Sequence, residues 1–480
     1  MEKTELPIII QGGMGVAVSD WRLANAVSRL GQLGVVSGTA LDVVLVRRLQ
    51  TGDIGGHIRR AATQFPIPEV VKSVFDKYFI EGGKQIKERF KSHPMGKLKP
   101  SRNLLDLQVL SNFVEVFLAR EGHEGTVGVN LLTKLQAPTI PSLYGAMLAG
   151  VDAVLMGAGI PREIPGVLDK LAAGEEASIK LDVKGADKDK PFWLRFDPAE
   201  YFKGLAPKLK RPKFFPIISS AVLAKMLSKN ATGDVDGFII EGPTAGGHNA
   251  PPRGKLQLTD DGEPVYGERD VADLEAIAKV GLPFWLAGSY AEPERVVEAL
   301  NAGATGVQVG TAFAYSNESG FSTEIKKEVI ASSKAGRAGV FTDPLASPTG
   351  FPFKVVPMPD TMSEENIYDK RERVCDLGYL RTAYVIDGDK LGWRCPSEPV
   401  RDFVRKGGDE AETVGRKCVC NALLASIELG QTQKSGEPEL PLVTSGDDVA
   451  RVARFVKPGA DSYSAADVIE YLLRDVKVSS

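Results

Sequence analysis

Eight short apolar runs constrain the fold of this chain more than any other feature. Each is rich in Val, Ile or Phe and ends in or beside a small or polar residue, and a helical pattern often follows. Strands that are buried on both faces read as continuous apolar runs, because neither face meets water. We therefore expect strands at Ile8–Gly12, Leu33–Gly38, Thr126–Leu131, Ala153–Gly157, Phe214–Ser219, Gly237–Gly242, Pro283–Gly288 and Gly306–Thr311.

Helical patterns alternate with several of these runs. They occupy Ser19–Leu30, Thr139–Leu148, Ala221–Ser228, Asp270–Lys279 and Glu292–Leu300. The alternation predicts an α/β protein with a TIM (β/α)8 barrel, right-handed at each crossover. A doubly wound sheet is the competing interpretation. Against it, no run is followed by G-x-G-x-x-G, and the nearest matches, GGMGVAV and GAGIPRE, lack the last glycine.

Three segments exceed what a minimal barrel needs. We expect residues 1–340 to form the barrel, with insertions at about 39–125 and 177–198, and residues 341–480 to form a C-terminal extension packed on it. The second insertion has two β-like runs around GADKDK, which predicts a hairpin. The extension contains apolar stretches that need burial, and Asp461–Arg474 has the pattern of a capped amphipathic helix.

Composition excludes several classes of partner. The net charge of −3 gives no global field that attracts nucleic acid or an anionic membrane surface. No segment approaches the roughly 18–20 uninterrupted apolar residues that a membrane helix needs. The N-terminus has acidic residues and only a very short apolar run, unlike a signal peptide. We expect a cytoplasmic protein that contacts neither nucleic acid nor membrane.

The segment Glu241–Pro251 (EGPTAGGHNAP) is the most informative in the chain. A strand ends in Glu-Gly, a glycine pair brings the backbone close to another group, and His248 follows at once. In a barrel this loop lies at the carboxyl ends of the strands, where active sites form. Imidazole titrates near neutral pH and accepts protons during catalysis. A turn-capping role is the alternative for a single histidine, but the setting favours a catalytic His248.

Two other groups of residues point to a cofactor. Backbone N–H groups of Gly288, Ser289, Gly310 and Thr311 stand after the last two strands, the customary phosphate site of TIM barrels. Near the N-terminus, the run Gly12–Gly15 lets a flat ring approach the main chain, and Asn130 is placed to donate to ring carbonyls. Ordinary turns are the alternative at each position.

Taken in order, IIIQGGMG, GVVSGT, GVNL, EGPTAGGH, LAGS and GVQVGTAF resemble the nitronate monooxygenase (2-nitropropane dioxygenase-like) family, which is related to the flavin-dependent enoyl-acyl-carrier-protein reductases. The resemblance covers roughly residues 6–320 and implies a TIM barrel with non-covalent FMN. It implies that His248 lies beside the flavin as base. It also implies that the cofactor is held by Gly13, Met14, Asn130, Gly246, Gly247, Gly288, Ser289, Gly310 and Thr311.

The resemblance implies oxidation of nitronates or nitroalkanes, with O2 as the second small molecule. Two alternatives stay open: an NAD(P)H-dependent enoyl-thioester reductase of fatty-acid or polyketide synthesis, whose substrate is an acyl thioester, and a non-catalytic binding or scaffold barrel. Both insertions and the long tail depart from the simplest family members. Insertions on the active-site face would remodel the substrate pocket, so the resemblance leaves the substrate open.

The remaining candidate residues lie outside the cofactor motifs. All four cysteines, Cys375, Cys395, Cys418 and Cys420, fall within 46 residues of the tail, where they either pack as reduced thiols or hold a tetrahedral Zn2+. C-x-C departs from the usual zinc knuckle, and no motif supports an iron–sulfur cluster. His57 is a weaker candidate for reaching the pocket. We expect His93 and His123 to face solvent.

Overall fold

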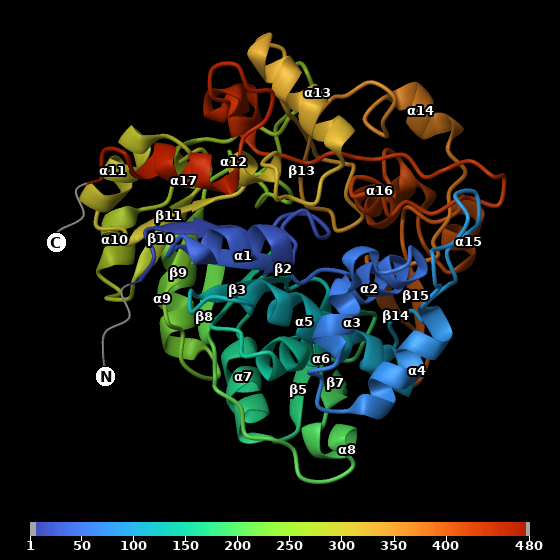
Figure 1. Ribbon diagram of the computed structural model, residues 1–480. Helices are drawn as coiled ribbons and strands as arrows, with labels where there is room; N and C mark the ends of the chain where they lie inside the picture. The colour runs from blue at the N-terminus through green and yellow to red at the C-terminus, as the bar shows by residue number, and fades with distance from the viewer. Residues whose placement is uncertain (1–5, 477–480) are drawn as a thin grey trace.

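A closed barrel of eight parallel strands forms the centre of the molecule (Figure 1). The computed structural model describes residues 6–476. Around the barrel the strands follow the order β1-β11-β10-β9-β8-β4-β3-β2, and β1 pairs with both β11 and β2, which closes the ring. All eight predicted strands are present. They are β1 (Ile9–Gln11), β2 (Leu33–Ser37), β3 (Val127–Leu132), β4 (Ala153–Gly157), β8 (Lys213–Ile218), β9 (Phe238–Glu241), β10 (Phe284–Ala287) and β11 (Gly306–Val309).

The barrel interior is a packed core and not a pore. Alternate residues of the strands point inward and form one apolar cluster, which includes Leu155, Phe215 and Trp285. Phe215 and Trp285 pack with their ring centroids 5.1 Å apart, and the Trp285 indole donates to the Pro7 carbonyl at 2.8 Å. This packing fills the barrel near the N-terminal ends of the strands, so the space for a ligand lies at the opposite end.

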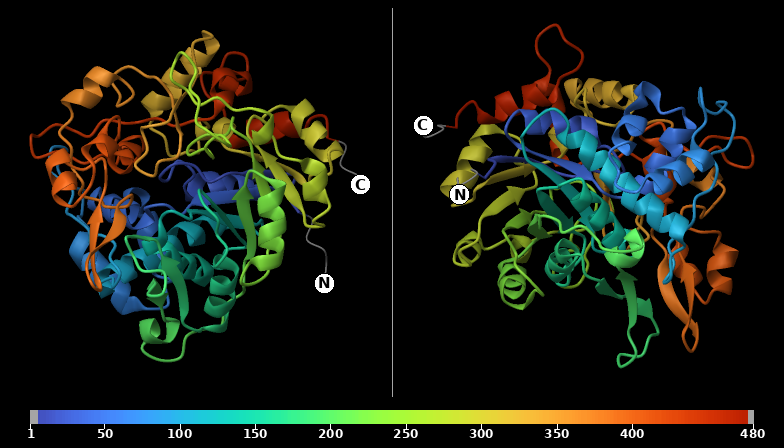
Figure 2. Two further views of the ribbon diagram at one scale, coloured as in Figure 1. Left: turned by 180° about the vertical axis from the view of Figure 1, so that it is seen from behind. Right: turned by 60° about the horizontal axis from the view of Figure 1, so that its bottom comes forward.

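Helices cover the outside of the barrel, as the sequence predicted (Figure 2). Asp20 caps the first helix, because its carboxylate accepts a hydrogen bond from the Arg22 backbone N–H at 2.9 Å. The helices that follow or flank the strands are α1 (Trp21–Arg29), α6 (Gln136–Leu148), α7 (Ile164–Ala173), α9 (Ala221–Asn230), α10 (Leu274–Ala278), α11 (Pro293–Asn301), α12 (Thr311–Ala314) and α13 (Thr323–Lys334).

The first insertion is helical. It comprises α2 (Leu41–Gln50), α3 (His57–Ala62), α4 (Pro68–Tyr78) and α5 (Arg102–Arg120), with a 3-10 turn at Ile54–Gly56. Helix α5 packs against α1, α2 and α6 and is buried on most of its surface. It therefore forms part of the helical layer around the barrel.

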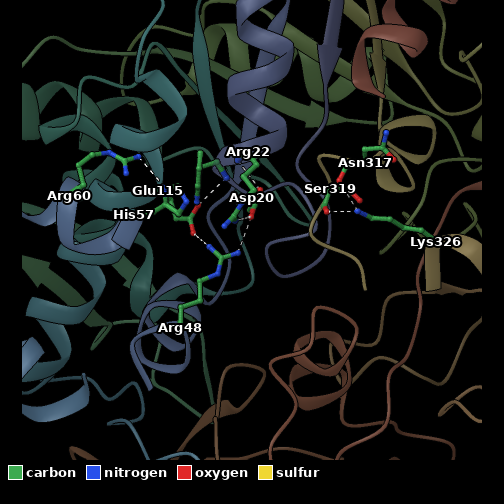
Figure 3. Close-up of polar contacts among 10 residues, drawn as sticks. Asp20, Arg22, Arg48, His57, Arg60, Glu115, Asn317, Ser319 and Lys326 are labelled. Atoms are coloured by element: carbon green, nitrogen blue, oxygen red, sulfur yellow. Dashed lines mark hydrogen bonds and ion pairs between the residues drawn. The ribbon is translucent and has the colours of Figure 1, made fainter. Parts of the chain in front are cut away.

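A buried charge network joins this insertion to the barrel (Figure 3). Arg48 of α2 contacts the Asp20 carboxylate at 3.0 Å and the Glu115 carboxylate at 2.5 Å. Glu115 also accepts from the Trp21 N–H at 3.0 Å, so α1, α2 and α5 share one set of ionic contacts. Breaking a buried pair by removing one partner typically costs about 3–5 kcal/mol. Nearby, Lys326 donates to the carbonyls of Asn317 and Ser319 at 3.1 and 2.7 Å.

The second insertion contains the predicted hairpin. Strands β5 (Ala177–Leu181) and β7 (Phe192–Phe196) pair antiparallel. Between them, the short β6 (Val183–Lys184) pairs with β14 (Thr382–Asp387) of the tail, and α8 (Pro198–Phe202) follows β7. The hairpin projects beside α6 and α7 at the bottom of Figure 1.

Residues beyond 340 contain regular elements with buried side chains. Strands β12 (Phe341–Asp343) and β13 (Phe353–Val355) pair antiparallel, as do β14 (Thr382–Asp387) and β15 (Lys390–Arg394). Helix α17 (Ala465–Leu473) contacts α1 and α11, and Ser464 caps it. The other elements are α14 (Glu365–Lys370), α15 (Val400–Arg405), α16 (Val419–Ala425) and 3-10 segments at Glu410–Thr413 and Asp447–Phe455.

The prediction that His93 and His123 face solvent is wrong for His93. Its side chain is only 4% exposed, its Nε2 lies 3.5 Å from an Asp42 carboxylate oxygen, and its ring stacks on Tyr379. The basic segment before it folds in between α2 and the tail, which the local sequence does not indicate. His123 is partly buried and hydrogen-bonded to the Ala119 carbonyl at 2.7 Å. In the range 6–476, no helix is long and apolar enough to cross a membrane.

Candidate active site

One cavity of about 390 Å³ opens at the carboxyl ends of the barrel strands. Every residue that the sequence analysis assigned to catalysis or cofactor binding lines it. These are Gly13, Met14, Asn130, Gly246, Gly247, His248, Gly288, Ser289, Gly310 and Thr311. They come from strand β3 and from the segments that follow β1, β9, β10 and β11, so the barrel brings together residues up to about 300 positions apart. His57 does not line this cavity: it packs against Trp21, with ring centroids 4.9 Å apart.

Both positions of the pair before His248 require glycine, each for a different structural reason. A Cβ at Gly246 would lie 2.7 Å from the backbone nitrogen of Gly446, closer than real contacts allow. Gly247 has φ of +76°, a left-handed conformation that other residues adopt only with strain. The loop is therefore fixed between strand β9 and the tail segment 444–448, and it presents His248 to the cavity.

His248 is held by residues of the tail. Its Nε2 lies 2.7 Å from the Ser347 hydroxyl, which is itself 2.8 Å from the Thr349 hydroxyl. The imidazole packs on the Phe353 ring, with centroids 4.7 Å apart. Burial lowers the pKa of His248 to about 4, because desolvation disfavours the charged ring. The ring is consequently neutral near pH 7 and can accept a proton.

Glu241 is a cavity residue that the sequence analysis did not assign. It ends strand β9 and lines the same cavity as His248. Burial raises the pKa of its carboxyl to about 8, because desolvation disfavours the charged form. A carboxyl that stays protonated near neutral pH can donate a hydrogen bond or a proton. Glu241 stands at a strand end in the motif that also contains His248, and this position could have identified it as a candidate from the sequence.

Gly13 and Asn130 lie in direct contact on the side of the cavity near β1 and β3. A Cβ at Gly13 would lie 2.4 Å from the Asn130 Cβ, so only glycine fits there. The Asn130 amide donates to the Leu155 carbonyl at 3.1 Å, which fixes its orientation. Gln308 of β11 also lines the cavity, and its buried Oε1 has no hydrogen-bond partner within residues 6–476. A buried amide oxygen without a partner is suited to a polar ligand.

Two residues on the predicted phosphate side have left-handed backbone conformations. Gly288 and Ser289 both have positive φ, of 99° and 56°, directly after β10. The Thr311 hydroxyl accepts from the Gly446 backbone N–H at 2.9 Å, so the tail also reaches this side. Met14 packs near Gly310, where a Cβ would meet its side chain at an ordinary 3.5 Å.

Comparison with known families finds a match for the part of the barrel that carries the glycine–histidine loop and the two glycine turns. Residues 207–342 match the family model described as "Nitronate monooxygenase". That segment carries His248 and both predicted phosphate turns. The family resemblance that the motifs predicted is confirmed over these residues.

Two curated relatives match parts of the chain. One, from Mycobacterium tuberculosis, is named "(3aS,4S,5R,7aS)-5-hydroxy-7a-methyl-1-oxo-octahydro-1H-indene-4-carboxyl-CoA dehydrogenase"; it is 28% identical over 208 residues, which are 39% of this chain and 54% of that protein. A "Probable nitronate monooxygenase" from Staphylococcus saprophyticus is 32% identical over 128 residues, 26% of this chain and 34% of that protein. The matches thus span about half or less of each relative.

Solved structures show similarity at low identity. FabK from Thermotoga maritima aligns at 17% identity with a TM-score of 0.47, over 98% of this chain and 92% of that one. A nitroalkane oxidase from Streptomyces ansochromogenes aligns at 14% identity with a TM-score of 0.49, over 98% and 96%. The barrel assignment depends on the strand order of this chain itself.

Proposed function

We propose that this protein is an FMN-dependent oxidoreductase of the nitronate monooxygenase type, oxidising nitronates or nitroalkanes with O2. The observation that carries the proposal is the convergence of all ten predicted cofactor and catalytic residues on one cavity at the barrel mouth. The family match over the segment with His248 supports the same chemistry.

The cavity fits FMN in three respects. The turns at Gly288–Ser289 and Gly310–Thr311 would hold the phosphate through backbone N–H groups. Asn130 packs directly on Gly13, and the two residues would form the wall against which the flat ring lies. The unpartnered Gln308 amide and Asn130 would meet the polar edge of that ring. Bound FMN would supply the electron transfer between substrate and O2.

The protein's own groups divide the proton chemistry. Neutral His248 would accept the α-proton of a nitroalkane, and Ser347 would hold the ring in position through its 2.7 Å hydrogen bond. Protonated Glu241 would donate a hydrogen bond to the oxygen that gains negative charge as the proton leaves. With pKa values of about 4 and about 8, the imidazole is unprotonated and the carboxyl is mostly protonated near pH 7, so the first can accept and the second can donate a hydrogen bond.

An absorbance spectrum followed by anaerobic titration tests this proposal. The purified protein should show a flavin spectrum, and a nitronate alone should bleach it without NAD(P)H. Cofactor released by heat should migrate as FMN on chromatography; release of FAD would contradict the cofactor assignment. Failure of several nitronates and nitroalkanes to bleach the bound flavin would contradict the reaction.

An NAD(P)H-dependent enoyl-thioester reductase is the second candidate. The observation that favours it is the name of the Mycobacterium tuberculosis relative, a dehydrogenase of a carboxyl-CoA thioester. Rapid anaerobic bleaching by NAD(P)H, reversed by an enoyl thioester, would support this candidate over the first. The four cysteines are free thiols, and we propose a cytoplasmic location, where thiols stay reduced.

A further inference from the structure

The four cysteines of the chain meet at one point in the tail, away from the barrel mouth. Cys375 precedes β14, Cys395 follows β15, and Cys418 and Cys420 flank the first residue of α16. All four line a single small cavity of about 10 Å³. Three separate segments of the chain therefore place their cysteine side chains around the same small cavity.

Two hydrogen bonds hold the side chain of Cys418 within this cluster. Its thiol donates to the Val374 carbonyl at 3.7 Å, and the Asn421 side-chain amide donates to its sulfur at 3.6 Å. Val374 directly precedes Cys375, so these contacts join the α16 turn to the segment that carries the first cysteine.

The charges around the cluster are mixed, with arginines close by. Arg381 interacts electrostatically with Cys375, Cys395 and Cys420, and Arg371 with Cys418. Glu398 and Glu439 also face the cluster, but they are paired with Lys406 at 2.6 Å and with Arg371. The arginines would offset part of the negative charge of four thiolates around a dication.

We propose that Cys375, Cys395, Cys418 and Cys420 bind one structural Zn2+ in tetrahedral geometry. Four thiolates complete the preferred coordination of zinc, which makes such sites closed and structural. As the side chains stand, no three His, Cys, Asp or Glu groups between residues 6 and 476 have ligating geometry, so binding requires the thiols to turn inward and release their protons. The small cavity admits a single ion more readily than an iron–sulfur cluster of several atoms.

The zinc site would also support the histidine of the active site. Arg416, two residues before Cys418, donates to the carbonyls of Leu345 and Ser347 at 2.6 and 2.7 Å. The Lys417 N–H donates to the Ala346 carbonyl at 2.9 Å. Since the Ser347 hydroxyl contacts His248, the segment 345–347 connects the metal-bound turn to the proposed base. This role is one of positioning, because none of the four cysteines lines the catalytic cavity.

Metal analysis of the untagged, full-length protein tests the proposal. We expect about one zinc per chain after purification without added metal, and release of that zinc by a mercurial thiol reagent. Protein produced with Co2+ should show sulfur-to-cobalt charge-transfer and tetrahedral d–d bands. Zinc content well below one equivalent, with all four thiols open to a disulfide reagent under native conditions, would overturn the site. Iron with acid-labile sulfide would overturn the zinc assignment.

Two variants sharpen the test. The double variant Cys418→Ser/Cys420→Ser should lose the zinc, whereas Val419→Ala, a change between the two proposed ligands, should keep it. If the double variant does not fold, the metal content and cobalt spectrum of the unmodified chain still decide the question. None of these measurements depends on bound flavin or turnover. The proposed zinc site and the proposed reaction are therefore tested independently of each other.

Discussion

Replacing Glu241 by Gln should remove the loss of folding stability that the Glu241 carboxyl causes as the pH rises. Burial raises the pKa of Glu241 from 4.5 to about 8, so the folded protein holds this proton more tightly than the unfolded chain. The resulting stabilisation is complete below pH 4.5 and is lost as the pH rises through 8. Each tenfold change in proton affinity corresponds to about 1.4 kcal/mol, which sets an upper bound of about 5 kcal/mol. Because the side chain faces an open cavity, we expect about 2–3 kcal/mol.

Urea denaturation of the cofactor-free protein at pH 5, 6, 7 and 8 measures this effect. The difference in unfolding free energy between Glu241→Gln and wild type should grow steadily in favour of the variant as the pH rises. His248 acts in the opposite direction, losing stability as the pH falls from 6.5 towards 4, but it is common to both proteins and cancels in the difference. Glu275→Gln, at an exposed carboxyl of α10, is the matched control. Parallel pH profiles for wild type and Glu241→Gln would refute the reasoning.

Three further predictions concern the site and the tail. His248→Ala should keep the fold and the yellow colour but lose about 10²–10⁴-fold in kcat, and unchanged kcat on every accepted substrate would show that His248 is not the base. Gly310→Val should weaken FMN binding far more than it lowers the stability of the cofactor-free fold. A Cβ at this position meets only Met14, at 3.5 Å, whereas the branched side chain would block the phosphate. Fluorescence quenching measures FMN binding, and denaturation measures the stability of the fold. Limited proteolysis should give no stable, FMN-bound core ending near Gly339 if residues 341–480 are a packed extension; rapid trimming to such a core would contradict that division.

The barrel could be predicted because its signal is local. Each parallel strand is buried on both faces, so its apolar run stands out in the sequence, and the turn residues that follow mark the active end. Every predicted strand is present within one to two residues of its expected bounds. The hairpin insertion was predictable for the same reason, since two β-like runs flanked an obvious polar turn.

Side chains that meet only through the tail could not be predicted. Ser347 and Phe353 contact His248 from about 100 residues further along the chain, and no periodicity links them to it. His93 stands in a basic stretch that suggests solvent, yet the fold places it against Asp42 and Tyr379. Such contacts depend on how the insertions pack on the barrel, which the local pattern of either segment does not specify.

The contacts of the tail suggest why the glycine–histidine loop has its particular sequence. Gly246 is confined by the backbone of Ser445 and Gly446, Thr311 accepts from Gly446, and His248 is held by Ser347. Residues beyond 340 therefore complete the cavity, although the strands that form the barrel end before residue 310. The groups that we propose to bind a phosphate or a flat ring lie on the barrel strands and loops, whereas the hydroxyl that holds the histidine lies on the tail. Because the tail also contacts Gly246 and Thr311, variation in the tail would alter both the space left for a substrate and the packing of two proposed cofactor residues.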